Sequence, residues 1–269
     1  MYSLRRIFLS LFLCLLLVMC KTVPLTNRSQ LALIPNDQIN SMSFSSYNSF
    51  LSENKVSNNT AQTNMVKTVG MRIKSAVETY LAENNMSEYV KGFEWEFNLV
   101  EDKAENAFCM PGGKVVFYTG IMPICKDETG VAVVMGHEVA HAIANHGNER
   151  MSQGLLQQLG GLSLAVALQS KPQETQNLFN GLYGIGTQVG VLLPYGRLQE
   201  SEADHLGLIF MAIAGYNPEQ APDFWERMSS NSKGASPPEF LSTHPSHETR
   251  IQNLKKWMPE AIKYYKKSS

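Results

Sequence analysis

The chain of 269 residues carries a formal net charge of -1, from 23 basic and 24 acidic side chains. No basic stripe interleaved with aromatic residues occurs along it, so nucleic acid is not expected as a partner. Hydrophobic residues make up 43% of the chain. At this length, one large domain or two small ones can bury a sizeable core.

The first residues have the features of an export signal. Arg5-Arg6 precede an apolar run over 7–19, which is too short for a stable membrane span but typical of a signal-peptide core. The run ends at Leu17-Val18-Met19-Cys20, which resembles the bacterial lipobox whose cysteine is acylated. Met19 departs from the small residue usual at that position, so a plain cleaved signal and an uncleaved anchor are the alternatives. We expect a lipoprotein-type signal peptide at 1–19 and a tether at 20–35, with Lys21 compatible with sorting to the outer membrane.

Periodic apolar residues predict the elements that come before the central motif. A stripe from Val66 to Leu81 predicts a helix capped by Asn59 or Thr60, and a shorter helix is indicated near 38–51. Alternation over 93–99 predicts a half-buried strand. Residues 106–110 and 114–119 read as two strands around Pro111-Gly112-Gly113, either as a hairpin or with a longer loop between them.

The central motif is His137-Glu138-Val139-Ala140-His141. Two histidines four residues apart share one face of a helix, so both imidazoles can reach one metal ion. Glu138 can then reach a water held on that ion, which is the H-E-x-x-H pattern of zinc metallopeptidases. Chance is the alternative, and the helix-like flanks argue against it. We expect the motif helix to be capped by Asp127 or Thr129 and to run to about Met151.

A catalytic zinc ion needs a third protein ligand and one open position. A second helix, predicted over 197–214, offers Glu200 and Glu202, which point to opposite sides because they lie two residues apart. Asp204 shares the face of Glu200 and can accept the spare N–H of a ligating imidazole. This pairing favours Glu200 as the ligand, the alternative being a solvated helix face.

Several segments leave alternatives open. The apolar stretches 155–168 and 178–193 are predicted as core helices, the alternative being an apolar hairpin that touches lipid or a partner. Cys109 and Cys125 are either a disulfide or two buried thiols. Further helices are expected over 218–229 and from about residue 246, with a loop at 229–240.

Taken together, the motifs resemble peptidase family forty-eight, the gluzincin zinc metallopeptidases that include HtpX-like, Oma-like and CAAX-prenyl endopeptidases. Within the family, the sequence resembles the exported bacterial branch in particular. The likeness covers about residues 30–258. It rests on Asn106-Ala107-Phe108, Pro111-Gly112-Gly113, the His137–His141 motif with His146 and Glu149-Arg150, Arg197, Glu200 to Asp204, Gly207, Ser242 to Pro245, and Arg250. It implies an α+β, mainly helical, zincin-type domain with a small sheet packed on the motif helix, which we place at 36–269.

The resemblance also assigns roles to residues. One Zn²⁺ would be held by His137, His141 and Glu200, with Glu138 as the general base and Asp204 supporting a ligand. Asn106, Ala107 and Phe108 would belong to an edge strand that pairs with the substrate backbone. His244 would be either an oxyanion donor or a reversible inhibitory ligand of the metal, and Arg250 is the other candidate donor. His146 and His247 are expected to be structural or at the surface.

The expected function is that of an exported zinc endopeptidase. It would act on misfolded or misassembled envelope proteins in the periplasm of a Gram-negative bacterium, attached to the outer membrane through lipid on Cys20. The main alternative is a chaperone-like envelope assembly factor that keeps a plugged zinc site. A purely structural zinc domain is a third class, and Glu138 argues against it because a structural site needs no base.

Overall fold

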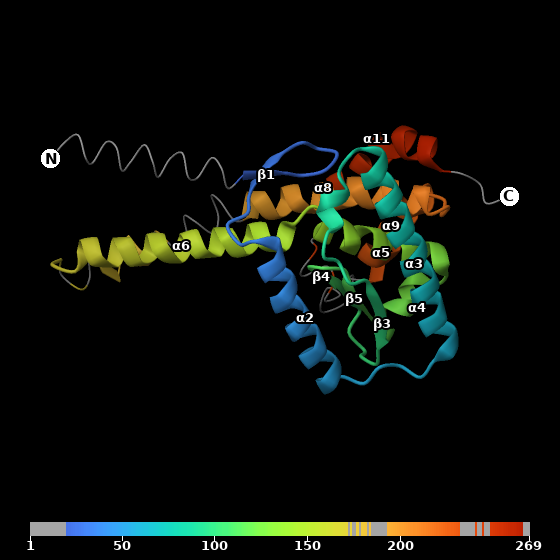
Figure 1. Ribbon diagram of the computed structural model, residues 1–269, viewed down its shortest axis with the longest axis horizontal. Coiled ribbons are helices and arrows are strands. Elements are labelled where there is room, and N and C mark those ends of the chain that lie inside the picture. The colour runs from blue at the N-terminus through green and yellow to red at the C-terminus, as the bar shows by residue number, and fades with distance from the viewer. Residues whose placement is uncertain are drawn as a thin grey trace. The chain divides into compact units, whose positions relative to one another are not determined.

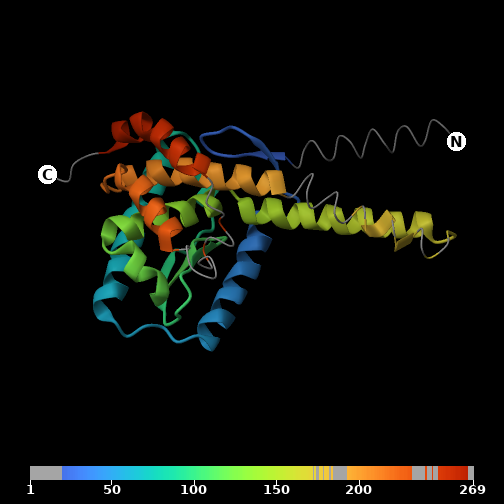
Figure 2. The same ribbon diagram turned by 180° about the vertical axis from the view of Figure 1, so that it is seen from behind.

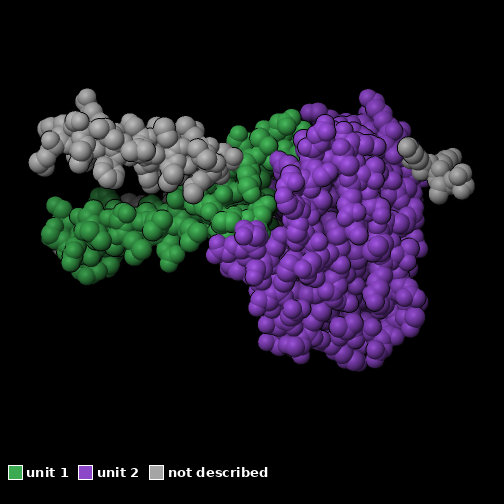
Figure 3. Space-filling view, in the orientation of Figure 1, with its two compact units in different colours: residues 1–36, 145–195 green, residues 37–144, 196–269 purple. Residues whose placement is uncertain are grey.

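The structure is a computed structural model that describes residues 20–171, 173, 176–177, 179–181, 183, 193–231, 240, 244 and 248–265. The chain groups into two compact units, coloured separately in Figure 3. Unit 1 comprises Met1–Asn36 and Asn145–Tyr195, and unit 2 comprises Asp37–Ala144 and Gly196–Ser269. The predicted boundaries of signal, tether and catalytic domain stay predictions.

The expected mainly helical architecture with small sheets is confirmed (Figure 1). The strands are β1 (Cys20–Thr22), β2 (Ser29–Leu31), β3 (Glu96–Val100), β4 (Ala107–Met110) and β5 (Lys114–Tyr118). The helices are α2 (Asn36–Glu53), α3 (Thr60–Glu83), α4 (Met122–Cys125), α5 (Glu128–Ile143), α6 (His146–Leu168), α8 (Leu193–Ile213), α9 (Gln220–Asn231) and α11 (Glu248–Tyr264). Short 3₁₀ helices lie at η1 (Ser87–Val90) and η2 (Thr119–Ile121).

Most predicted helices are present, with shifted ends. The helix near 38–51 is longer than expected and becomes α2, and the 66–81 stripe lies within α3. The Asn59 side chain caps α3 by accepting from Gln62 N, as predicted. The helix expected from Arg197 begins at Leu193, and the last described helix begins at Glu248. The loop expected over 229–240 is helical at its start, because α9 continues to Asn231, and residues 232–239 lie outside the described part of the chain.

Unit 2 is built on a three-stranded sheet in the order β3-β5-β4. β5 runs parallel to β3 and antiparallel to β4, with Val115 opposite both Phe97 and Cys109. Side chains alternate across a strand, so Phe97, Val115 and Phe117 share the face on which α3 and α5 pack. The opposite face, with Val116, packs on Tyr47 of α2. Figures 1 and 2 show this sheet between the helices.

The predicted hairpin around Pro111-Gly112-Gly113 is confirmed. Gly112 and Gly113 have φ values of 83° and 86°, in the left-handed region that favours glycine. The strand expected over 93–99 begins only at Glu96 and runs to Val100, so Phe93 and Trp95 lie before it. A Cβ on Gly113 would lie 2.8 Å from the Trp95 ring. A larger residue at 113 would therefore displace the Trp95 side chain.

The motif helix α5 ends earlier than predicted. Asp127 caps its start by accepting from Gly130 N, as expected. The continuation to about Met151 is wrong, because α5 stops at Ile143 and α6 begins at His146. Asn145 between them has φ 58° and ψ 29°, a left-handed conformation that interrupts an α-helix. Asparagine tolerates this region better than most residues, and no periodicity in the sequence marks the position.

Two glycines bring α5 and α8 together. A Cβ on Gly136 would lie 2.7 Å from the Gly207 carbonyl oxygen, and a Cβ on Gly207 would lie 2.8 Å from the carbonyl carbon of Gly136. The two backbones therefore touch one residue before the first motif histidine. This crossing sets the distance between the motif helix and the helix that carries Glu200.

We predict that Gly136→Ala separates the two helices. The added methyl group meets backbone, which cannot rotate away, so the free energy of unfolding should fall by about 1–3 kcal/mol. Chemical denaturation measures this change. Gly154→Ala is the matched control, because a Cβ at Gly154 has no atom within 4 Å. Equal stability of the two variants would contradict the tight crossing.

Unit 1 joins a small hairpin to α6. β1 pairs antiparallel with β2, with Thr22 opposite Ser29. The Arg28 guanidinium donates to both carboxylate oxygens of Glu149, at 2.6 and 2.8 Å. Glu149 is 1% exposed, so this ion pair fastens the hairpin to the start of α6.

The prediction of a core helix over 155–168 is wrong. Leu155, Leu159 and Leu162 of α6 are exposed to solvent, although they are spaced as one helical stripe. Most of the second stretch, 178–193, lies outside the described residues. None of the described helices is both long enough and apolar enough to cross a bilayer.

Candidate metal centre

Four buried side chains from separate parts of unit 2 converge on one point. His137 and His141 lie on α5, Glu200 on α8, and His244 between α9 and α11. Each offers one ligand atom, and these atoms all lie within 4.8 Å of one another. Because the four side chains are nearly free of solvent contact, the cluster is a candidate metal site in the interior of unit 2.

The separations between these atoms fit a zinc ion. Nε2 of His137 lies 3.1 Å from Nε2 of His141 and 3.2 Å from Nδ1 of His244. The Glu200 carboxylate oxygens lie 3.3 Å from Nε2 of each motif histidine. Ligands about 2.1 Å from a tetrahedral zinc ion are about 3.4 Å apart. Three imidazoles and one carboxylate are ordinary zinc donors, so the residues present fit one Zn²⁺.

The structure brings Glu200 to the two motif histidines. Both of its oxygens also lie near Nδ1 of His244, at 3.0 and 3.1 Å. Burial alone would raise the pKa of Glu200, but the His141 charge and hydrogen bonds from the imidazoles hold it well below its ordinary value. The carboxylate is therefore ionised, as a metal ligand must be. Glu202 is also buried, yet it is not a member of the cluster.

The Asp204 carboxylate contacts the ring nitrogen of His137 that does not face the other ligands. Nδ1 of His137 lies 2.9 Å from Oδ1 of Asp204, which lies one helical turn after Glu200 on α8. Burial and the Arg250 guanidinium both oppose a charge on His137, but hydrogen bonds to Asp204 and Glu200 outweigh them and raise its pKa to about 9. Because Asp204 lies beside Nδ1, the ring is held with Nε2 facing the cluster.

Arg250 is turned toward this carboxylate. Its Nη2 donates to Oδ1 of Asp204 at 2.6 Å, and the guanidinium carbon lies 3.2 Å from the ring centroid of Trp225. The contact with Asp204 pairs two buried charges. Arg250 was one of two candidate oxyanion donors, and this geometry instead fits a residue that fixes Asp204.

Glu138 and His244 face each other beside the cluster. Nε2 of His244 lies 3.5 Å from Oε1 of Glu138, while its Nδ1 faces Glu200. Among the described residues, Oε1 of Glu138 is buried without a hydrogen-bond partner. His244 therefore lies between the Glu138 carboxylate and the other ligand atoms.

Two aromatic residues that the sequence did not single out line the cluster. Phe240 stacks on His244 with ring centroids 4.7 Å apart. Trp225 of α9 meets the His137 ring edge-on at 5.5 Å. In the sequence, Trp225 is indistinguishable from any other apolar residue of a helix core. These rings exclude water from one side of the ligands and make the site drier.

The remaining candidates lie around the cluster without joining it. Cys109 and Cys125 are free thiols. Burial, and the Glu138 charge nearby, raise the pKa of Cys109, so it is not a thiolate ligand. His146 is fully buried, and His247 lies outside the described residues. Asn106, Ala107 and Phe108 lie at or just before β4, an edge strand that packs on α5.

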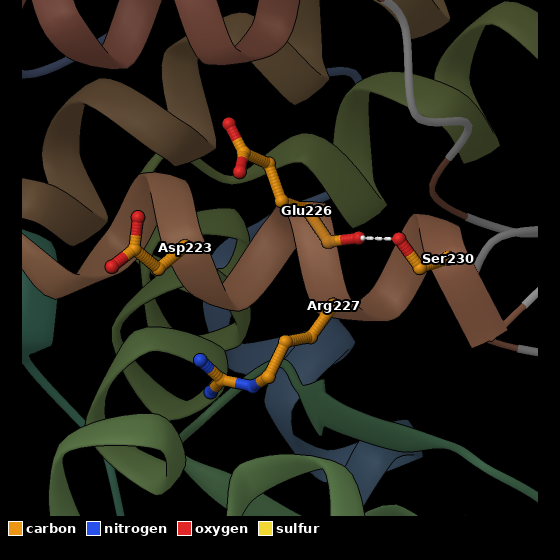
Figure 4. A pocket seen from close by; sticks show the side chains of 4 residues that line it. All are labelled: Asp223, Glu226, Arg227 and Ser230. Carbon is orange, nitrogen blue, oxygen red and sulfur yellow. Dashed lines mark hydrogen bonds between the residues drawn. The ribbon is translucent and has the colours of Figure 1, made fainter.

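A surface pocket on α9 is separate from the metal-ligand cluster. It is lined by Asp223, Glu226, Arg227 and Ser230 (Figure 4). Ser230 Oγ donates to the backbone oxygen of Glu226, and the Arg227 side chain extends away from the two carboxylates. None of the four belongs to the metal-ligand cluster.

Comparison with known proteins decides the family. The model of Peptidase family M48 matches residues 69–258, which include both motif histidines, Glu200 and Arg250. The chain belongs to this family. The expected zincin-type fold, with a small sheet on the motif helix, is thereby confirmed.

Several relatives carry the name of a metalloendopeptidase. The chain is 35% identical to mitochondrial metalloendopeptidase OMA1 of Schizosaccharomyces pombe over 190 residues, which cover 70% of this chain and 53% of the relative. It is 29% identical to human OMA1 over 248 residues, 89% of this chain and 46% of the relative. The beta-barrel assembly-enhancing protease of Escherichia coli K12 is 28% identical over 166 residues, 60% and 34% respectively. The chain spans about half the length of these relatives, or less.

Proposed function

We propose that the chain is a zinc-dependent endopeptidase in which His137, His141 and Glu200 hold the metal and Glu138 is the general base. The observation that carries the proposal is the convergence of three buried ligands from two helices beside the buried Glu138 carboxylate, whose Oε1 has no hydrogen-bond partner among the described residues. A structural zinc site would not need that carboxylate. Cleavage of an unfolded protein by the wild type but not by a Glu138→Gln variant tests the proposal.

In the proposed reaction, bound zinc supplies a Lewis acid that acidifies water and polarises the scissile carbonyl group. Glu138 takes the proton of the attacking water and passes it to the leaving amine. With zinc bound, Asp204 would accept a hydrogen bond from Nδ1 of His137, so that Nε2 would be the ligand atom. Arg250 balances the buried charge of Asp204.

The substrate would lie along β4 as an added strand. The Asn106 carbonyl accepts from Tyr118 N, so residues 106, 108 and 110 pair with β5. Alternation in an antiparallel ladder then turns the peptide groups of Ala107 and Cys109 outward. An extended peptide can pair with them through its backbone whatever its side chains are. Asn106 Oδ1 accepts from Ala107 N, so the substrate would have to compete with that bond.

His244 is proposed to be a reversible plug. An open catalytic site keeps one position for water and substrate, and Nδ1 of His244 lies where a fourth ligand would be. Its Nε2 also faces Glu138, which separates the base from the remaining ligands. The geometry fits the inhibitory-ligand alternative better than the oxyanion-donor alternative.

We predict that His244→Ala increases the rate of cleavage of an unfolded protein by roughly tenfold, because the fourth position opens to water. Initial rates on a fluorescently labelled unfolded substrate measure the change, with zinc content checked in the same samples. His205→Ala is the control, because His205 pairs with Glu260 and stacks on Trp257, outside the cluster. A loss of activity in His244→Ala alone would favour the oxyanion-donor role.

The position of His244 also supports the second candidate function, that of a chaperone-like assembly factor. A protein whose site is always closed by His244 would act as a chaperone-like assembly factor that retains zinc. It would contain stoichiometric zinc and leave unfolded protein intact even as His244→Ala. Activity of that variant separates the two candidates.

The proposed substrates are misfolded or misassembled proteins of the bacterial envelope. Support comes from the signal-like first residues and from similarity to the E. coli relative named beta-barrel assembly-enhancing protease. The OMA1 relatives are named as mitochondrial, so the similarities by themselves do not select a compartment. The proposed attachment through acylated Cys20 is tested by mass spectrometry of the mature N-terminus.

A further inference from the structure

The α6 helix of unit 1 carries an apolar stripe that packs on nothing described. Met151, Leu155, Leu159, Leu162 and Val166 follow one another at steps of three and four residues, which places them on one face. The exposed fraction is 58% for Leu159, 59% for Leu162 and 72% for Val166. Soluble monomers seldom leave so continuous an apolar surface in water, and such surfaces mark binding sites.

The opposite side of α6 already has a partner. Tyr183 Oη donates to the Gln157 carbonyl oxygen at 3.0 Å, and a Cβ on Gly160 would lie 2.1 Å from that hydroxyl. Tyr183 follows the end of α6 at Leu168 in the sequence, yet its side chain contacts the middle of that helix. Gln157 lies about half a turn around the helix from Leu155 and Leu162. The stripe therefore faces away from Tyr183.

The charge pattern of α6 fits a lipid surface. No ionisable side chain occurs from Met151 to Ser170, while Arg150 and Lys171 stand at the two ends. A protein interface is usually rimmed by polar and charged residues, including arginine. When such a helix lies along a membrane surface, cationic residues at both of its ends can instead contact the phosphates of one headgroup layer. Gly154 and Gly160 weaken the helix in water, so contact with an apolar phase would stabilise it.

The stripe belongs to the same unit as Cys20. Besides the Arg28–Glu149 ion pair, Leu33 N donates to Ser152 Oγ, and the Asn148 side chain donates to Ile34 O. These contacts fix the segment that follows Cys20 to the first turns of α6. A chain attached at Cys20 would therefore hold α6 near the membrane surface.

We propose that the exposed face of α6, from Met151 to Val166, lies in the interface of a phospholipid membrane. The leucine and valine side chains enter the outer acyl region, and Arg150 and Lys171 contact headgroup phosphates. The helix lies along the surface and does not cross the bilayer. The inference is independent of the peptidase chemistry, since all four residues of the metal-ligand cluster belong to unit 2.

A tryptophan reporter tests this proposal in the full chain. Leu162→Trp is reconstituted into vesicles of phosphatidylcholine with phosphatidylglycerol, with and without bromine on the acyl chains, and the emission of the three native tryptophans is subtracted. Val166→Trp is a second reporter in case the first variant folds poorly. Met71→Trp is the control, because Met71 is 52% exposed on α3 of unit 2.

The proposal predicts that brominated chains reduce the added emission at 162 and 166 by about half or more, since the stripe enters the acyl region. The emission at 71 should be unchanged. Equal emission at all three positions with and without bromine would overturn the proposal. A blue-shifted emission at 162 that bromine does not quench would also overturn it, because it would show the stripe covered by protein, such as a second copy of the chain.

Discussion

Glu138→Gln is expected to abolish proteolysis while leaving the protein folded and loaded with zinc. Glutamine has nearly the same shape but cannot take a proton from water, and removal of a general base lowers rates by about a hundred- to ten-thousand-fold. Glu138 lies on α5 with 3% exposure, lies 3.5 Å from His244, and is not one of the four residues of the cluster. The zinc ligands should therefore keep their places.

The measurement is kcat/KM on an unfolded protein, made beside the zinc content of the same preparation. Glu149→Gln serves as the matched control, because Glu149 is a buried carboxylate paired with Arg28 in unit 1. Substantial activity in Glu138→Gln with full zinc would assign the base to another residue. A joint loss of zinc and activity would mean that Glu138 supports the site structurally.

Glu200→Gln should lose the metal itself. An amide carries no charge, and Glu200 is the one anionic member of the cluster. Loss of an outer partner of a ligand already lowers metal affinity about ten- to hundredfold, so loss of the ligand should lower it by more. Chelator competition gives the affinity, and activity should fall in proportion to bound zinc.

Glu202→Gln is the control for this change. It lies on the same helix and is 3% exposed, but it is not one of the cluster residues. The proposed assignment requires Glu202→Gln to retain zinc while Glu200→Gln loses it. The reverse result would identify Glu202, and not Glu200, as the third ligand.

The core of the site followed from helical geometry. The spacing of His137 and His141 placed both imidazoles on one face, and Asp204 one turn after Glu200 favoured that glutamate over Glu202. The hairpin around Gly112-Gly113 followed from turn chemistry. These features are local, so the sequence contains the information that determines them.

The features that the sequence did not predict depend on tertiary structure. The break at Asn145 is one residue in a left-handed conformation, inside a pattern that otherwise reads as continuous helix. The exposure of Leu159 and Val166 cannot be seen from periodicity, because a stripe on a core helix and a stripe on a lipid-facing helix have the same spacing. The contact of Trp225 with His137 joins residues far apart in the chain.

The most direct test of the account is a crystal structure of the zinc-loaded chain with anomalous data at the zinc edge. The account predicts one zinc peak in unit 2, about 2.0–2.2 Å from Nε2 of His137, Nε2 of His141 and a carboxylate oxygen of Glu200. A peak bonded elsewhere, or a Glu200 carboxylate well outside bonding range with no other acidic group in its place, would contradict it.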